Sequence, residues 1–562
     1  MQLPAIHIAQ AMGIQLFIAD GNADAPGAGS SSGFYHIDLK DLPGLTAAAA
    51  DIRDRGGLDG VLTVGTDFSA SVAWVAQAHN LPGISYEAAL NASRKDRMRK
   101  VLREHQIPCP GFVSLTPGAE DLRYPEKPAE VLLEKISREG LEYPLVVKPG
   151  DNMGARGVRK ISGPRELGPA AAEALRYSPG LTLVLEEEIR GVEYSLDSLI
   201  SDDTAMPMGI ARRSIDYPPY YIERGHDFPS GLSEESAHEM FDTLFRAAAA
   251  LGISRGAAKG DVFMTERGPV IGEVAARLSG GYMSGWTYPL HSGVHPAVGA
   301  VLIALGENPG KYEEYFTPQS RIGVSERGMV SIPGTLKDVI FDRRIIPAGA
   351  APGSREEAGE FHFITVRSGD ELRFPRNNVE KCGNIICREE QGSGGATSAQ
   401  RAEAGVAAYL FRLAPVKPSR LQHILGSDFP PAYPRLMSLF LKDYAALSLD
   451  SDRLISEDSY RKVDEFTIPQ AYLEYGEQDW NYRSLSQSLR DTRRIHQDFS
   501  WAAGGSAGDN PEMLFCLLRA GYQGLCYYLE AENSQNHHNS TDISRDEAIR
   551  NIIQEYSALS GE

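Results

Sequence analysis

The sequence predicts a protein of the α/β (α+β) class with several domains. Residues 1–92 alternate helix and strand signals, a rhythm that is typical of a parallel sheet. Residues 318–425 contain alternating patterns such as FHFITV at 361–366, which favour strands. After residue 430, apolar residues recur at three- and four-residue spacings, which predicts helices. We therefore expect domains at 1–92, 93–310, 311–427 and 428–562.

Composition excludes some classes of partner. The chain has 562 residues, 42% of them hydrophobic, which is enough for three or four domains with their own cores. The net charge of -19 disfavours a nucleic-acid partner, because phosphate binding needs clustered lysine and arginine. No apolar run approaches the roughly 20 residues of a membrane helix. Residues 1–20 also lack the basic start of a signal peptide. We expect no membrane partner and a cytoplasmic location.

The elements expected in residues 1–92 follow one another regularly. They are a helix near 4–12, a strand at 16–19, a helix at 45–55, a strand at 60–64 and a helix at 69–79. The segment TVGTD at 63–67 follows a strand, where open α/β sheets bind ligands. An ordinary loop aspartate is the plainer interpretation of Asp67.

Residues 145–158, LVVKPGDNMGARGV, join an apolar strand to a glycine-rich turn. Lys148 lies at the end of the strand, and Gly150, Gly154 and Gly157 permit positive φ angles. Successive N–H groups in such a turn can surround an anion such as a polyphosphate. An ordinary hairpin turn explains this stretch equally well, because the Gly-Lys-Ser/Thr of the Walker pattern is absent.

A second stretch, LVLEEEIRGVEYSLDSLI at 183–200, places a run of carboxylates between two expected strands. A solvated surface usually explains such a run. Between two strands, however, a hinge can offer backbone groups to a flat heterocycle and a carboxylate to ribose hydroxyls.

A third stretch, KGDVFMTERGPVIGEVAARLSGG at 259–281, predicts a hairpin that turns at Arg267 and Gly268. Paired strands would bring Asp261 and Glu273 to one face. Two carboxylates, completed by phosphate oxygens and waters, are ligands that Mg²⁺ prefers.

These three stretches, in this order, resemble the ATP-grasp superfamily, specifically the carboxylate-amine ligases near carbamoyl phosphate synthase and the purine-pathway ligases. The resemblance covers roughly residues 1–425. It implies an N-terminal pre-ATP-grasp domain, an ATP-grasp domain with a lid at about 115–190, and a C-terminal β domain. The helical tail is an addition to that plan. The implied ligands are ATP and Mg²⁺ or Mn²⁺.

The resemblance also implies roles for matching residues. Within it, 154–158 covers the phosphates, 186–189 is the adenine hinge and Glu193 contacts the ribose. The implied metal ligands are Asp261 and Glu273, and the implied catalytic residues are Lys95 and Arg277. The full implied nucleotide site is Lys95, Lys148, Gly154, Ala155, Arg156, Gly157, Val158, Glu186, Glu187, Glu188, Ile189 and Glu193.

Two features depart from the family's pattern. The family usually has Glu-x-Asn-x-Arg at the metal, whereas this chain has Ala275 in place of the asparagine, so one amide ligand is missing. The family begins with an apolar strand, whereas MQLPAIHIAQAMG predicts the first helix. Either the sheet lacks its first strand or the start has been assigned late.

Residues 210–233 are rich in proline, tyrosine and arginine, which predicts a loop. Such a loop would select the acceptor. Arg212 and Arg213 would hold a carboxylate, which makes Arg212 a further catalytic candidate, and His226 would take a proton. Surface cations and a capping histidine explain these residues equally well.

The expected activity is the ATP-dependent joining of a carboxylate to an amine through an acyl phosphate, with release of ADP and phosphate. A purine-pathway carboxylase or formyl ligase is one alternative, and a non-catalytic nucleotide-binding protein is another. The expected partners are a small-molecule carboxylate and amine, and a homodimer is an open alternative to a monomer.

Overall fold

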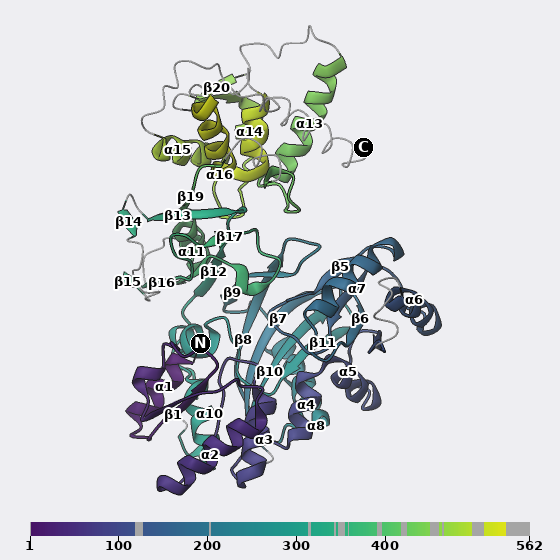
Figure 1. Cartoon of the computed structure of the whole chain (residues 1–562), viewed down its shortest axis with the longest axis vertical. Helices are drawn as coiled ribbons and strands as arrows, with labels where there is room; N and C mark the ends of the chain where they lie inside the picture. The colour runs from purple at the N-terminus through teal and green to yellow at the C-terminus, as the bar shows by residue number, and fades with distance from the viewer. Residues whose placement is uncertain are drawn as a thin grey trace. The chain divides into compact units, whose positions relative to one another are not determined.

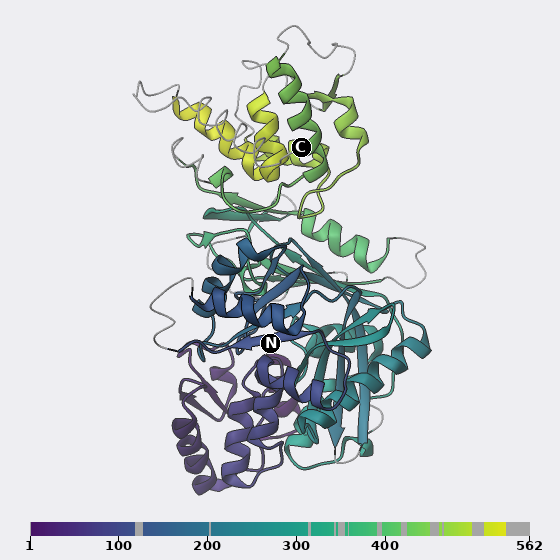
Figure 2. The same ribbon diagram turned by 90° about the vertical axis from the view of Figure 1, so that its right-hand side faces the viewer.

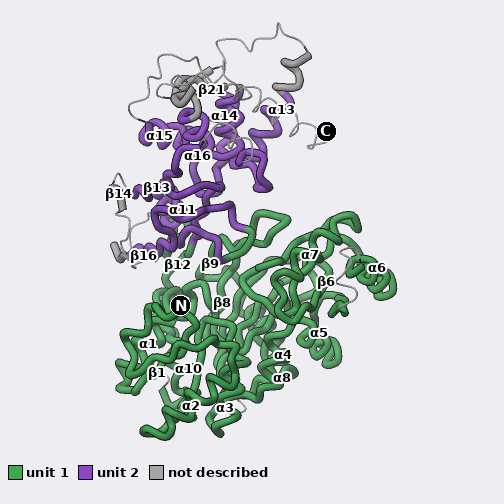
Figure 3. The backbone as a smooth tube through the Cα atoms, in the orientation of Figure 1, with its two compact units in different colours: residues 1–326, 376–378, 386–399 green, residues 327–375, 379–385, 400–562 purple. Residues whose placement is uncertain are grey.

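A computed structural model describes most of the chain (Figure 1). The described residues are 2–118, 127–201, 204–312, 316–341, 344–346, 355–357, 359–389, 396–416, 424–449, 460–463, 466–496 and 511–535. They fall into two compact units (Figure 3). Unit 1 comprises residues 1–326, 376–378 and 386–399, and unit 2 comprises 327–375, 379–385 and 400–562. In the described part of the chain, no helix is long and apolar enough to cross a membrane.

The N-terminal part of unit 1 contains helices and a small parallel sheet. Its elements are α1 (Leu3–Ala11), β1 (Phe17–Asp20), β2 (Gly33–His36), α2 (Leu42–Gly56), α3 (Ser69–His79) and α4 (Tyr86–Ser93). Strands β1 and β2 pair in parallel. The predicted strand at 60–64 is wrong, because no described strand pairs with this segment. The side chain of Gln2 contacts it instead, accepting a hydrogen bond from Val64 N at 3.2 Å and donating to Thr63 Oγ1 at 2.9 Å.

A four-stranded sheet carries Lys148, and we call it the small sheet. Its strand order is β3-β6-β4-β5, with all pairs antiparallel. The strands are β3 (Phe112–Leu115), β4 (Leu145–Pro149), β5 (Arg159–Ile161) and β6 (Leu183–Glu187), and the helices are α6 (Lys127–Glu139) and α7 (Leu167–Arg176). Leu145, Val147 and Leu185 face a core shared with the helices. Because side chains alternate along a strand, Lys148 and Glu186 lie on the opposite face.

Five antiparallel strands of unit 1 are neighbours in the order β11-β10-β7-β8-β9, and we call them the large sheet, although the strand order continues through β12 (Val324–Met329) to nine strands. They are β7 (Val192–Ser201), β8 (Thr204–Asp216), β9 (Ile222–Phe228), β10 (Arg255–Thr265) and β11 (Gly268–Ala275). Helices α5 (Lys95–Glu104) and α8 (Glu234–Leu251) pack on one face (Figures 1 and 2). Helices α9 (Tyr288–Ser292) and α10 (Pro296–Ala304) follow β11, and α10 packs against the other face.

The prediction of a loop at 210–233 is wrong over most of that range, because β8 and β9 occupy it. The prolines of this range lie outside both strands: Pro218 and Pro219 are in the turn between them, and Pro229 follows β9. Pairing of β8 with both β7 and β9 satisfies the backbone groups of the arginine-rich segment, so tertiary pairing decides its structure.

Unit 2 combines strands with the helices that follow them. The chain passes between the units within β12 (Val324–Met329), β18 (Gly383–Arg388) and α11 (Ser398–Ala407). The further strands are β13 (Gly334–Phe341), β14 (Arg344–Ile346), β15 (Arg355–Glu357), β16 (Glu360–Ile364), β17 (Glu371–Leu372) and β19 (Tyr409–Leu413). Strand β13 pairs with β14, β17 and β19, all antiparallel. The predicted α/β (α+β) class is confirmed.

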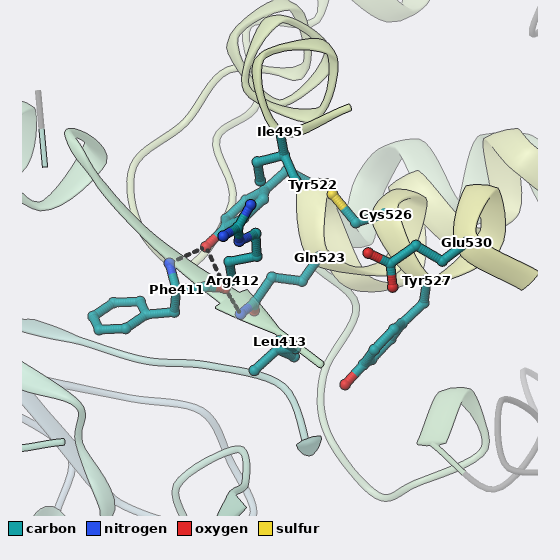
Figure 4. Close-up of a pocket in the computed structure, with 9 residues that line it drawn as sticks. All are labelled: Phe411, Arg412, Leu413, Ile495, Tyr522, Gln523, Cys526, Tyr527 and Glu530. Carbon is teal, nitrogen blue, oxygen red and sulfur yellow. Dashed lines mark hydrogen bonds between the residues drawn. The ribbon is translucent and has the colours of Figure 1, made fainter. Parts of the chain in front are cut away.

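The later part of unit 2 is mainly helical. Its elements are α13 (Pro434–Leu449), β20 (Tyr460–Val463), β21 (Phe466–Pro469), α14 (Gln470–Glu474), α15 (Leu485–Ile495) and α16 (Pro511–Gln535). Helix α16 is hydrogen-bonded to β19. The Tyr522 hydroxyl accepts a hydrogen bond from the N–H of Phe411 at 2.7 Å, and Gln523 donates one to the carbonyl of Phe411 at 3.0 Å (Figure 4). The sequence also predicts a helix at 543–559, where ISRDEAIRNIIQEYSAL carries apolar residues at three- and four-residue spacings, but this stretch lies outside the described residues.

Candidate active site

Lys148 and Glu186 lie on neighbouring strands of the small sheet and form a buried ion pair. Lys148 Nζ is 2.7 Å from Glu186 Oε2. Arg99, from helix α5, contacts the same carboxylate through Nε at 2.8 Å and Nη2 at 3.1 Å. Arg99 is 1% exposed and Glu186 is 2% exposed. Two cations therefore share one buried carboxylate.

This arrangement sets the ionisation of Glu186. Burial alone raises the pKa of a carboxyl group, but Arg99 and Lys148 outweigh it and lower the pKa of Glu186 to about 2. Its side chain is thus a fixed anion that positions both cations. Sequence reasoning missed Arg99, although the signal was available: it follows Lys95 by four positions and so lies on the same face of α5.

Lys95 connects the glycine-rich turn with a predicted metal ligand. Its Nζ donates to Asn152 O at 2.8 Å and lies 3.2 Å from Glu273 Oε1. Its backbone N–H donates to Gly150 O at 2.7 Å, which ties the start of α5 to the turn. Burial raises the pKa of Glu273, but the lysines Lys95, Lys259 and Lys148 lower it to about 2.

The turn at 150–158, which we call the glycine loop, has positive φ angles at two of the three glycines for which its sequence predicts them, but not at Gly150. Positive φ angles occur at Gly154 (64°), Ala155 (59°) and Gly157 (68°). Arg156 points back toward the start of the loop, with Nη1 3.3 Å from Asn152 Oδ1, and Val158 N–H donates to Ala155 O at 3.2 Å. Such a turn can direct backbone N–H groups at an anion.

The segment 186–189 connects the small sheet to β7. Glu187 pairs with Gly111 in both directions: its N–H donates to Gly111 O at 3.0 Å, and its carboxylate accepts from Gly111 N at 3.2 Å. Glu188 accepts from Lys160 at 2.8 Å and from the Tyr221 hydroxyl at 3.0 Å. Ile189 is half-buried. This connection has the position of the predicted hinge.

Asp261 and Glu273 face each other across the hairpin of β10 and β11. Asp261 is in ionic contact with Lys259 and with Arg213, whose Nη1 lies 2.6 Å from Asp261 Oδ1. That oxygen is buried and accepts no hydrogen bond from the described residues. Two facing carboxylates are ligands that a hard divalent cation prefers, and here their charge is met by Arg213 and by lysines. Ala275 offers no ligand atom.

Arg213 lies among three carboxylates, which we call the carboxylate cluster: Glu193 from β7, Glu223 from β9 and Asp261 from β10. Arg213 Nη2 is 2.6 Å from Glu223 Oε2, and Nη1 also contacts Glu193. Burial lowers the pKa of Arg213, but the three carboxylates raise it well above its ordinary value. Burial raises the pKa of Glu193, against the opposing effect of Arg213.

The structure does not bring the predicted residue Arg212 to this cluster. Successive residues of a strand point to opposite faces, so Arg212 lies on the other side of β8 from Arg213 and is exposed. The loop predicted at 210–233 would not have this alternation. The strand pattern distinguishes the two neighbouring arginines.

Arg277 is fixed by the N-terminal part of unit 1. Its Nε lies 2.5 Å from Asp67 Oδ1, and Nη1 donates to Leu278 O at 2.8 Å. Burial lowers the pKa of Arg277, and Asp67 more than compensates, so the pKa is raised. Asp67 is therefore a structural partner of the predicted catalytic arginine.

A buried histidine lies beside the carboxylate cluster. His226 Nδ1 is 2.7 Å from Glu326 Oε2, and its Nε2 is 3.6 Å from Glu223 Oε2. Nε2 is buried and has no hydrogen-bond partner among the described residues. The three side chains offer ligand atoms within 4.8 Å of one another, as a metal site would. Because Arg213 already contacts Glu223, we interpret the group as an oriented imidazole.

Comparisons with known proteins agree with this geometry. Residues 141–285 match the family model described as "ATP-grasp domain". An uncharacterized protein, y4rH, of Sinorhizobium fredii is 28% identical over 250 residues, which are 43% of this chain and 48% of that protein. The D-alanine--D-alanine ligase of Mycolicibacterium smegmatis is 27% identical over 296 residues, which are 49% of this chain and 70% of the ligase.

A solved structure shows the same fold. The L-amino acid ligase from Bacillus licheniformis superposes with a TM-score of 0.55 at 20% identity, covering 69% of this chain and 90% of that protein. The chain spans about half the length of y4rH, with which it shares the highest of the identities above. The sequence match, the fold and the facing carboxylates agree: the chain carries an ATP-grasp domain, whose homologues include carboxylate-amine ligases.

Proposed function

We propose that the protein is an ATP-dependent ligase that joins a carboxylate to an amine and releases ADP and phosphate. The observation that carries the proposal is the position of Lys95, which contacts both the glycine loop and Glu273. A cation between a phosphate-binding turn and a metal carboxylate is placed where a γ-phosphate would be transferred. The names of the ligases that match the chain support the same reaction class.

Lys148 and Lys95 would bind the nucleotide phosphates, because Lys148 lies on the strand that leads into the glycine loop and Lys95 Nζ contacts Asn152 O within it. Glu186 and Arg99 hold Lys148 in place, so little side-chain entropy is lost on binding. Asp261 and Glu273 would hold Mg²⁺ or Mn²⁺. When bound, such an ion neutralises the charge on the phosphate oxygens.

The proposed first step transfers the γ-phosphate to a carboxylate oxygen and gives an acyl phosphate and ADP. Arg277 would stabilise the charge that spreads over the transferring group, since its fork can contact two oxygens at once. Asp67 fixes the orientation of that fork. No nucleophilic side chain is needed, because the substrate carboxylate itself attacks phosphorus.

In the proposed second step, the amine nitrogen attacks the acyl carbon, the C–N bond forms, and phosphate leaves. The attacking nitrogen must lose a proton. Glu326 accepts from His226 Nδ1, which leaves the lone pair of Nε2 available, so His226 can accept that proton. The nearby Glu223 would attract the amine while it is still an ammonium ion.

The test is a substrate screen that monitors ADP release from Mg-ATP with amino acids, other small carboxylates and bicarbonate. For the productive carboxylate, hydroxylamine should trap a hydroxamate, and ¹⁸O from that carboxylate should appear in the released phosphate. Formation of AMP and pyrophosphate without labelled phosphate would contradict the proposal. Activity with bicarbonate alone would support the carboxylase alternative. The cytoplasmic location and the homodimer remain predictions.

A further inference from the structure

A short segment far along the chain lies between the glycine loop and the carboxylate cluster. Residues 376–378 belong to the same compact unit as both, although more than 150 residues separate Asn378 from Glu223 in sequence. The backbone N–H of Asn378 donates to Gly154 O at 2.9 Å. Its side-chain Oδ1 accepts the backbone N–H of Glu223 at 2.8 Å. One residue thus touches the loop with its backbone and strand β9 with its side chain.

These contacts complete a continuous chain of polar groups. Gly154 contacts Asn378, Asn378 contacts Glu223, and Glu223 contacts Arg213, which in turn contacts Asp261. The position of the glycine loop is therefore linked through Asn378 to Glu223 on strand β9. A displacement of the loop would act on the Glu223 backbone through Asn378.

A second set of contacts joins the small sheet to the turn between β8 and β9 without Asn378. Lys160 N–H donates to Pro219 O at 2.8 Å, and Glu188 accepts from both Lys160 and Tyr221. The guanidinium groups of Arg159 and Arg376 lie 6.0 and 5.6 Å from the centre of the Tyr220 ring. Removing the Asn378 side chain should therefore leave the small sheet docked against the turn between β8 and β9.

We propose that Asn378 is a positioning residue that couples closure of the glycine loop on the nucleotide to the ordering of the Glu223 region, where the acceptor amine is expected to bind. This inference rests on the proposed function, because it requires nucleotide under the loop. Coupling of this kind is reciprocal, so nucleotide and acceptor each strengthen the binding of the other. The size of the effect follows from one hydrogen bond and corresponds to roughly 2- to 10-fold.

Hydrogen exchange of the full-length protein tests the coupling without knowledge of the acceptor. The probe is Mg-AMPPNP, a non-hydrolysable ATP analogue, and the readouts are peptides that cover 150–160 and 222–228. In the parent protein the nucleotide should slow exchange in both segments. In Asn378→Ala the loop should still respond, whereas the nucleotide-induced slowing at 222–228 should fall by roughly 2- to 10-fold.

Two further variants separate coupling from a merely structural role. Asn378→Asp keeps an oxygen acceptor for Glu223 N–H and should restore the response at 222–228. Asn308→Ala is the matched control, since Asn308 Oδ1 also accepts one backbone N–H, that of Gly310, at 2.8 Å but lies outside the chain of contacts described above. It should behave as the parent.

The possible failures are distinguishable. If nucleotide slows exchange at 222–228 equally in Asn378→Ala and the parent, or does not slow it in the parent although the loop responds, the inference about Asn378 is overturned while nucleotide binding stands. If nucleotide leaves 150–160 unchanged in the parent, the proposed nucleotide site fails and the inference fails with it.

Discussion

Two ionic clusters of unit 1 are built from the same residue types in opposite proportions. Around Glu186, one carboxylate is shared by the cations Arg99 and Lys148. Around Arg213, a guanidinium is shared by three carboxylates, Glu193, Glu223 and Asp261. The first cluster has an excess of positive charge and the second an excess of negative charge.

The pKa shifts reflect this difference. Despite burial, the pKa of Glu186 is lowered to about 2, because cations dominate its surroundings. The pKa of Glu193 is raised, because burial and neighbouring carboxylates outweigh Arg213. An excess of cations suits phosphates, and an excess of carboxylates suits a metal ion or an ammonium group. We therefore propose that the phosphates bind beside the first cluster and that a metal ion or an ammonium group binds beside the second.

The largest effect should come from neutralising the predicted metal ligands. We expect Asp261→Asn with Glu273→Gln to lower turnover by about 10³-fold, because the charge that holds the metal is lost. Calorimetry should show that the variant binds ATP without the Mg²⁺ dependence of the parent. Unchanged binding of Mg-ATP would show that these carboxylates do not hold the metal.

The next effect concerns stability and the cation-rich cluster. Arg99→Met should lower the free energy of unfolding by about 3 kcal/mol, since it removes one partner of a buried ion pair and leaves Glu186 with Lys148 alone. Arg97→Met, on the same helix, is the control. Arg97 contacts the largely exposed Glu87, so its loss should cost less than about 1 kcal/mol. Urea unfolding of both variants measures the difference, and equal losses would contradict the assigned role of Arg99.

The acid dependence of stability should distinguish the clusters. The folded-state pKa of Glu186 is about 2 against an ordinary 4.5, so its contribution is fully present above about pH 4.5 and is lost as the pH falls toward 2. The free energy of unfolding of the parent should therefore exceed that of Glu186→Gln by about 3 kcal/mol near neutral pH. In acid the two free energies should converge. Unfolding midpoints measured from pH 7 to pH 3 give both curves.

Glu193→Gln is the contrasting variant in that series. Because the pKa of Glu193 is raised in the folded state, its ionisation weakens the folded state as the pH rises. With increasing pH, the free energy of unfolding of Glu193→Gln should rise relative to that of the parent, whereas that of Glu186→Gln should fall relative to it. If stability changes with pH in the same way in both variants, the two clusters do not differ in ionisation as proposed.

Much of this site could be predicted from sequence where one local pattern decides the structure. The hairpin of β10 and β11 follows from two strands and a glycine turn, and it places Asp261 opposite Glu273 as expected. The glycine loop follows from its glycines only in part, since Gly154 and Gly157 have the predicted positive φ angles, whereas Gly150 does not and Ala155 does. In these stretches the residues that determine the backbone lie next to the residues that carry the chemistry.

The rest depends on contacts between distant segments. Residues 60–64 have strand composition but no partner strand in the described part of the chain, and residues 210–233 have loop composition but form much of β8 and β9. Arg99 and Asn378 matter because of Glu186 and Gly154, which their own segments do not reveal. Sequence patterns report local preference, whereas strand partners and buried ion pairs are chosen by the whole fold.

The smallest predicted effect tests the two clusters on different parts of one nucleotide. Lys148→Ala should weaken ATP and 2′-deoxy-ATP equally, by roughly 10-fold or more, because its ammonium meets the phosphates. Glu193→Ala should instead remove the preference for ATP over 2′-deoxy-ATP, which one hydrogen bond to the ribose sets at roughly 2- to 10-fold. Glu193→Gln keeps an oxygen acceptor and should keep part of that preference, which separates ribose contact from the altered charge around Arg213. Competition binding with the two nucleotides gives the ratio directly. If Glu193→Ala weakens both nucleotides by the same factor, Glu193 acts only through Arg213 and has no contact with the ribose.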